Sequence, residues 1–425
     1  MIAWLLISFF VLLFLGVPIA MSLGLSAMGG ILFLGGGSTV TIAQRMFEGM
    51  NSFALLAIPL YTFAGFTMSK GGISKRLMDF CYSIVGHIYG GLAHVNVLSS
   101  MIFAGISGSA VADTAGVSGM FMPEMVRKGY SKNFTVAVTA ISSPIGIIIP
   151  PSIPMVVIAG ICGISTGKLF LGGIIPGVLC GLAQMIVSYF MAKKEGVPKE
   201  PGHFTIGPVL HGLWESWPAL LMPIIIVGTI TMGIVSPTEA GVIAVVYGLF
   251  AGGIIYRELK WEDIKFAFAE TVRTSGRIFI VIGAAKLYTV MLTTAGFDKW
   301  VAKTMLGFST NPTVILIMIL LIFFIVTMFM ESIATLTLFM PILYPIALGV
   351  GIDPIVLSVL ITVVIGVGLV TPPVGMCIYV ACDLMDVTVG EVFPTLVPFI
   401  AATFVCIALM VAFPQLILLP TYLMA

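Results

Sequence analysis

The sequence predicts an all-α polytopic membrane protein with two re-entrant helical hairpins and two discontinuous helices, arranged as an inverted repeat. Three observations predict this fold. The composition suits a chain immersed in lipid, long apolar segments recur along the whole chain, and a proline pair interrupts one apolar segment in each half. A proline inside a helix removes a backbone donor and clashes with the preceding turn, so two such pairs require an explanation.

The composition excludes a soluble globular domain. Of 425 residues, 59% are hydrophobic and 9% are charged, whereas soluble domains carry roughly a quarter charged residues. The bilayer is therefore the expected solvent. The formal net charge of +1 and the absence of a basic block give no sign of a nucleic-acid partner. The six cysteines lie mostly in apolar runs and are expected to be small buried hydrophobes.

Ten segments are long enough to be read as full membrane spans, for which about 20 apolar residues are needed. They lie near 2–16, 17–35, 53–69, 131–165, 169–192, 216–235, 237–256, 276–295, 355–382 and 394–418. The first segment lacks a basic flank and a small-residue cleavage site, so we expect a retained span rather than a signal peptide. Two amphipathic stretches, 203–217 and 258–277, are expected to lie along the membrane surface.

Two further apolar blocks, 88–126 and 313–346, are interrupted at their centres by the polar stretches GISGSAVADTAG and FMESIATLT. These stretches would place Asp113 and Glu331 at membrane depth. A re-entrant hairpin whose tip is buried in protein accommodates them better than an uninterrupted crossing. The alternative is a pair of ordinary tilted spans whose polar side chains are satisfied by neighbours.

The basic segments support the hairpin interpretation. Segments 193–200 and 257–265 are separated by two spans and so share one face, which the positive-inside rule assigns to the cytoplasm. The basic turn at 69–76 and the pair Arg127-Lys128 fall on that same face only if 88–126 is a hairpin. Both termini are then expected on the outer side.

The proline pairs belong to an internal repeat. Displacing the sequence by 222 positions overlays residues 129–159 on 351–381 and aligns Pro150-Pro151 with Pro372-Pro373. Shorter matches at nearby displacements keep the same order. We therefore expect both proline pairs to serve the same purpose in related halves.

Each predicted half contains five full spans and one hairpin. Residues 1–200 form the first half, with a broken helix at about 131–165, and residues 201–425 form the second, with a broken helix at about 355–382. An odd number of spans turns the second half over, which is the inverted-repeat architecture of secondary transporters. Scaffold and transport parts are expected to be interleaved.

Each broken helix paired with its hairpin tip is a candidate cation site, because free carbonyls, hydroxyls and one carboxylate form an oxygen cage suited to Na⁺. The expected ligands are Ser107, Ser109, Asp113, Gly146, Ile149 and Pro151 in the first half, and Glu331, Ser332, Thr335, Gly368 and Thr371 in the second. Ser142, Ser143, Thr337, Pro150 and Pro372 are expected to contact a substrate. The alternative is that Asp113 and Glu331 only cap buried helix ends.

Four stretches, GISGSAVADTAGVSGMFMPEM, SSPIGIIIPPSIP, FMESIATLTLFMPIL and GLVTPPVG, occur in this order and resemble the large membrane subunit of tripartite ATP-independent periplasmic (TRAP) transporters. The resemblance implies an elevator-type importer, not an enzyme, in a bacterial inner membrane. It would carry an organic acid such as sialic acid or a C4-dicarboxylate, driven by a gradient of Na⁺, with two or more ions. It also implies periplasmic termini, a separate small membrane subunit and a periplasmic substrate-binding protein.

Carried onto this sequence, the sodium sites of that family fall on Ser107, Ser109, Asp113, Gly146 and Pro151, and on Glu331, Thr335, Gly368 and Thr371. The second carboxylate is a glutamate, whose longer side chain could coordinate at one remove. Three alternatives remain open: a stand-alone Na⁺/dicarboxylate symporter of similar architecture, an intramembrane enzyme with Asp113 and Glu331 as paired acids, and a passive channel.

Overall fold

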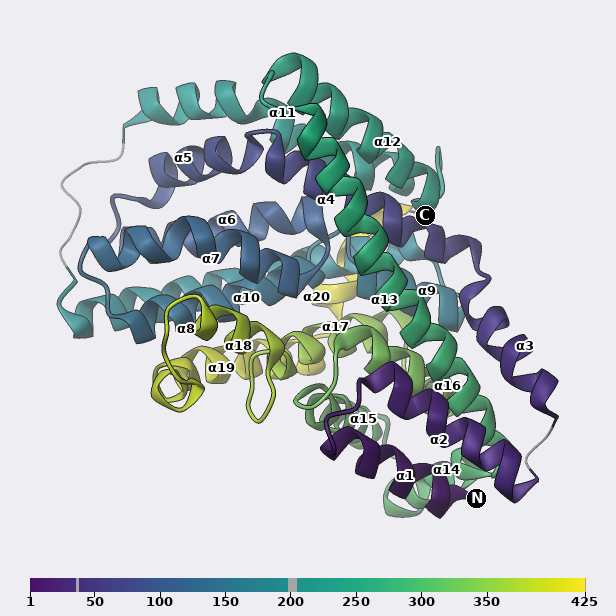
Figure 1. The fold of residues 1–425 in the computed structure, drawn as a ribbon. Coiled ribbons are helices and arrows are strands. Elements are labelled where there is room, and N and C mark those ends of the chain that lie inside the picture. The colour runs from purple at the N-terminus through teal and green to yellow at the C-terminus, as the bar shows by residue number, and fades with distance from the viewer. Residues whose placement is uncertain (36–37, 198–204, 425) are drawn as a thin grey trace.

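The computed structural model describes residues 1–35, 38–197 and 205–424, and within these ranges the regular elements are all helices (Figure 1). Seven helical segments are long and apolar enough to cross a membrane. They are η1–α4 (Phe53–Lys70), α10 (Thr166–Glu195), α11 (Ile206–Thr231), α12–η3 (Pro237–Ile255), α13 (Trp261–Thr294), α16 (Ser332–Gly349) and α19 (Val389–Ala412). The chain is thus a multi-pass membrane protein, and the predicted all-α fold class is confirmed.

Both predicted hairpins are present. In the first, α6 (Gly91–Ser107) packs against α7 (Ala110–Arg127) across a turn at Gly108-Ser109. In the second, α15 (Pro312–Thr327) packs against α16 across a turn that contains Glu331. The polar centres of the two apolar blocks therefore form the hairpin tips, because turn backbone needs polar partners that an uninterrupted helix does not.

Both predicted breaks are present too. Helix α8 (Lys132–Ser142) passes into a 3₁₀ turn, η2 (Ser143–Ile147), before the chain resumes as α9 (Ile153–Cys162). Helix α17 (Pro354–Gly368) is followed by α18 (Met376–Asp383). A proline pair lies in each gap, and each pair contains a cis peptide bond.

The elements follow the same order twice. The first series is α3 (Thr39–Met50), α4 (Ala57–Lys70), α5 (Ile73–Val85), the first hairpin, the first broken helix and α10. The second series is α13, which takes the place of both α3 and α4, then α14 (Phe297–Phe308), the second hairpin, the second broken helix and α19. The inverted relation of the halves and their boundary near residue 200 stay predictions.

The two amphipathic stretches that were expected along the membrane surface are continuous with the helical segments that follow them. Residues 206–217 are the N-terminal part of α11, which accommodates Pro218 and Pro223. Residues 261–277 are the N-terminal part of α13, which has 34 residues and no proline. The position of these stretches along the membrane surface stays a prediction.

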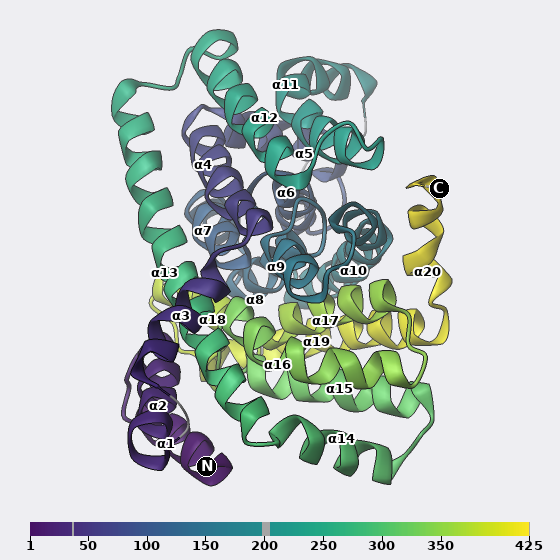
Figure 2. The same ribbon diagram turned by 90° about the vertical axis from the view of Figure 1, so that its right-hand side faces the viewer.

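The two N-terminal spans are shorter than expected. Helix α1 (Ile2–Phe14) has 13 residues and α2 (Ile19–Leu34) has 16, fewer than the about 20 of a full crossing. They pack against the C-terminal part of α13, where Leu5, Leu23 and Tyr288 share one buried apolar cluster. In Figures 1 and 2, α13 runs along one side of the molecule and passes the hairpins and broken helices.

Candidate functional site

The tip of the first hairpin lies directly on the first break. The Ile153 amide donates a hydrogen bond of 3.3 Å to the Gly108 carbonyl. Gly108 has φ +63°, and a Cβ there would lie 2.7 Å from the Pro151 carbonyl oxygen. Only glycine combines this conformation with so close an approach, so the two predicted halves of the first site are in contact.

Asp113 lies at the centre of the first site. It is in the first turn of α7, where the positive end of the helix dipole favours a carboxylate, and it is 4% exposed. A methyl group added to Gly146, within η2, would overlap the Asp113 carboxylate. Asp113 and Gly146, predicted as ligands of one cation, are therefore adjacent.

The second hairpin meets the second break in the same manner. The amides of Val374 and Gly375 donate to the Met328 carbonyl at 3.1 and 3.4 Å. Gly368, the last residue of α17, lies so close to Thr327 of α15 that a methyl group would overlap the threonine side chain. Each tip thus provides a backbone carbonyl that accepts a bond from the chain just after a proline pair.

Glu331 caps a helix. Its carboxylate accepts hydrogen bonds from the Ile333 and Ala334 amides at 2.9 and 3.3 Å and from the Ser332 hydroxyl at 2.6 Å. The capping role that was one of two interpretations of the sequence accounts for these contacts of Glu331.

Three predicted threonines of the second half donate to backbone carbonyls of their own helices. The predicted ligands Thr335 and Thr371 donate to Glu331 at 3.1 Å and to Val367 at 2.7 Å, and the predicted substrate contact Thr337 donates to Ile333 at 2.7 Å. A hydroxyl that donates in this way keeps lone pairs for a cation. These three oxygens are compatible with the predicted role.

The remaining predicted ligands of the first site differ in how their side chains are placed. Ser109 caps α7 by accepting a bond of 3.5 Å from the Ala112 amide. Ser107 ends α6, but its side chain lies outside the described part of the structure. The Ile149 side chain points to Gly177 of α10, so only the backbone of Ile149 is left to face a cation.

Two predicted substrate contacts point into the protein. The Ser142 hydroxyl donates to Asn96 Oδ1 at 3.0 Å, and the Ser143 hydroxyl donates to the Thr139 carbonyl at 2.8 Å. Both serines are fully buried. Sequence reasoning missed Asn96, and the available signal was an amide within the first arm of the predicted hairpin.

The two halves meet where α18 of the second break packs against α7 of the first hairpin, which carries Asp113. Helix α18 begins directly after Gly375, whose amide donates to the Met328 carbonyl at the tip of the second hairpin. The two candidate sites therefore border one region, although they come from different halves.

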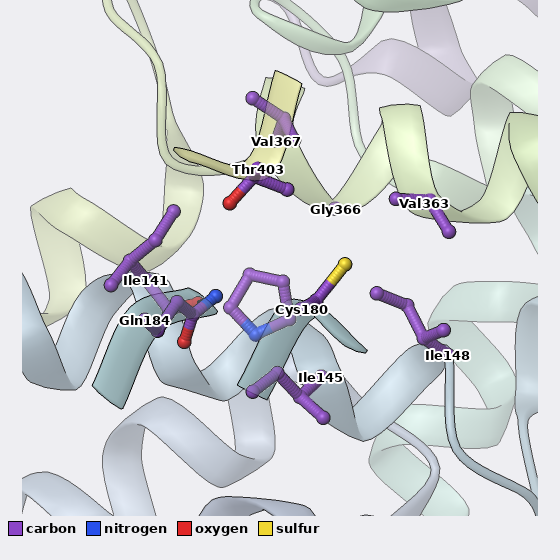
Figure 3. A pocket seen from close by; sticks show the side chains of 10 residues that line it. Ile141, Ile145, Ile148, Cys180, Gln184, Val363, Gly366, Val367 and Thr403 are labelled. Atoms are coloured by element: carbon purple, nitrogen blue, oxygen red, sulfur yellow. The ribbon is translucent and has the colours of Figure 1, made fainter. Parts of the chain in front are cut away.

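A small cavity lies behind the first break (Figure 3). It is lined by Ile141, Pro144, Ile145, Ile148, Cys180, Gln184, Val363, Gly366, Val367 and Thr403. Its volume is about 10 Å³, room for about one water molecule. None of the predicted ligands lines this cavity, and it is too small for an organic acid.

Two hairpins whose tips meet two broken helices define a membrane transporter of the discontinuous-helix class. The chain matches, over residues 6–416, the family described as the tripartite ATP-independent periplasmic transporter, DctM component. It belongs to that family, and the predicted resemblance is confirmed.

Relatives share about a third of the sequence. An isethionate TRAP transporter permease protein from Oleidesulfovibrio alaskensis is 37% identical over 92% of the chain, which covers 62% of that relative's length. A sialic acid TRAP transporter large permease protein from Vibrio cholerae is 35% identical over 96% of the chain and 95% of the relative. A C4-dicarboxylate TRAP transporter large permease protein from Pseudomonas aeruginosa is 35% identical, with 95% and 94% covered.

A solved structure shares the fold. The crystal structure of the YdaH transporter of Alcanivorax borkumensis, described as having an unusual topology, superimposes with a TM-score of 0.60 at 13% identity. The match covers 87% of both chains.

Proposed function

We propose that this protein imports a small organic acid across the bacterial inner membrane, coupled to Na⁺ entry. One observation carries the proposal: in each half, a polar hairpin tip lies on a proline break, with Asp113 beside Gly146 in the first half. Such half-helix ends and carbonyls are where secondary transporters hold coupling ions.

Two or more Na⁺ are assigned, at least one to each site. The first site would use Asp113 with oxygens of Ser109 and the backbone near Gly146, and the second would use oxygens around Glu331, Thr335 and Thr371. Na⁺ is a hard cation that takes oxygen ligands.

The proposed motion is an elevator. The hairpins and broken helices would move together past a scaffold that includes α13, which packs against α4 and α16 from different halves. Alternating access by rigid motion of one part against another is the usual consequence of inverted repeats. Both termini are placed in the periplasm.

The substrate and partners follow from the relatives. The names of three relatives specify isethionate, sialic acid and C4-dicarboxylate, all of them organic anions, and the family is named as tripartite. We assign a small organic acid as the substrate, a separate small membrane subunit, and a periplasmic binding protein that delivers the ligand.

The test is uptake by proteoliposomes that contain this chain and its small subunit. The binding protein encoded beside it would be supplied with the acid that co-purifies with it. We expect uptake only with inward Na⁺ and the binding protein present. Uptake without the binding protein would favour a stand-alone symporter, and uptake unaffected by replacing Na⁺ with choline would overturn the coupling.

A further inference from the structure

Asn96 joins the first hairpin to the first broken helix. It is fully buried on α6. Its Nδ2 donates to Thr139 Oγ1 at 2.7 Å, and its Oδ1 accepts from Ser142 Oγ at 3.0 Å. Ser100, one turn further along α6, also donates to Ser142 Oγ at 3.0 Å. We call these four residues, Asn96, Ser100, Thr139 and Ser142, the Asn96 network.

The network ends next to the first candidate site. Ser142 is the last residue of α8, and η2, which contains Gly146, follows directly. The Asp113 carboxylate lies against Gly146. A rotation or slide of α8 against α6 would therefore move Gly146 relative to the carboxylate carried by the same hairpin.

The second half has no such network. At the 222-residue displacement, Thr139 and Ser142 correspond to Ile361 and Val364. Helix α15, the counterpart of α6, contains no Asn or Ser. Helices α15 and α17 pack against each other, but in the described part of the chain no side-chain hydrogen bond joins them. Side-chain hydrogen bonds therefore join α6 to α8 in the first half, whereas α15 and α17 of the second half meet through apolar contact.

Directional bonds and apolar contacts constrain helices differently. Apolar side chains tolerate a small slide, particularly in a membrane, where lipid competes equally for apolar surface. A closed set of buried hydrogen bonds fixes one register, because each shift leaves a polar group unsatisfied. We infer that Asn96 is a positioning residue that fixes α8 and its 3₁₀ turn against the first hairpin, so that the first cation site is preformed.

This inference rests on the proposed Na⁺ coupling and predicts which variants weaken Na⁺ binding. Thr139→Val and Asn96→Leu should each raise the Na⁺ concentration for half-maximal thermal stabilisation of the purified chain by roughly three- to tenfold. Na⁺ would be exchanged for choline at constant ionic strength. The double variant should raise this Na⁺ concentration no more than the more damaging single variant does, because both substitutions remove the Asn96–Thr139 hydrogen bond.

A matched control is available in the second broken helix. Thr362, like Thr139, is fully buried and donates to the carbonyl four residues earlier, at 2.9 Å compared with 2.8 Å for Thr139. It receives no bond from a hairpin. Thr362→Val should therefore leave the Na⁺ midpoint unchanged while removing the same hydroxyl.

The outcomes separate the inference from the function it rests on. If the wild-type chain shows no Na⁺-dependent stabilisation, the proposed coupling fails. If the wild type responds but Thr139→Val behaves like Thr362→Val, the coupling stands and the positioning role is overturned. Should Asn96→Leu fail to fold, the conservative Thr139→Val still decides the question.

Discussion

The two proline breaks are built alike but differ in how far their residues are buried. Pro150, Pro151 and Ser152 of the first break are buried, whereas Pro373 and Val374 of the second are exposed. The contrast continues into the next helix. Val157 and Tyr379, which correspond at the 222-residue displacement, are 1% and 51% exposed.

The hairpins show the opposite contrast. Ala112 and Gly116 of α7 are exposed, whereas the corresponding residues of α16, Ala334 and Leu338, are buried in the cluster formed with α13. The first break and the second hairpin are covered, and the second break and the first hairpin are not. The two related halves are thus unequally buried in this structure, and under the proposed alternating access it would be one of two conformations.

The largest expected effect is at the covered first site. Asp113→Ala should abolish Na⁺-driven uptake in proteoliposomes, because it removes the only carboxylate we assign to that site. Asp113→Asn, which keeps the shape without the charge, should also fail. Wild-type uptake from either variant would exclude Asp113 as a ligand.

Gly146→Ala should reduce uptake by roughly tenfold or more, since overpacking at a closed contact displaces one of the partners. The added methyl group would collide with the Asp113 carboxylate. Gly228→Ala in α11 is the control, because a Cβ there meets nothing within 4 Å. Equal uptake by both variants would contradict the close packing of the first site.

The difference in burial between the two breaks predicts a difference in the labelling of cysteines placed there. In a variant without its native cysteines, Val374→Cys and Tyr379→Cys should react with a membrane-impermeant maleimide. Ser152→Cys and Val156→Cys, which replace buried residues, should not. Mass spectrometry of the purified chain gives the labelled fractions, and similar labelling of the two pairs would remove the asymmetry.

The smallest effect concerns the cap at the second hairpin. Glu331→Ala should lower the unfolding free energy by about 1 kcal/mol, as loss of a helix cap does. Asp353 caps α17 through the Ile355 and Val356 amides, so Asp353→Ala is the matched control. Only Glu331→Ala should also shift the Na⁺ midpoint. If the two variants behave alike, Glu331 is a cap and no more.

The hairpins and breaks were predictable because each leaves a local mark. Prolines and a buried carboxylate in apolar runs, such as Pro372 and Asp113, cannot lie in an ordinary span without a special environment. The continuity of α11 and α13 left no such mark, because a polar helix that continues into a membrane helix has the same periodicity as a separate amphipathic helix.

The Asn96 network and the unequal burial of the two breaks could not be predicted from the sequence, for another reason. Asn96, Thr139 and Ser142 are far apart along the chain, and a single amide or hydroxyl in a membrane helix has many possible partners. The repeat relates Val157 to Tyr379 but is symmetric. It specifies two equivalent packings without saying which one is occupied, and only the structure distinguishes them.

Helix α13, with its 34 residues, is about 51 Å long at 1.5 Å per residue. The hydrocarbon layer is about 30 Å thick. A helix of this length must tilt steeply or extend well into the headgroup region. Its tilt therefore depends on the thickness of the surrounding bilayer. Membranes of different thickness would then favour different inclinations of α13, and bilayer composition would become a variable that tunes the rate of transport.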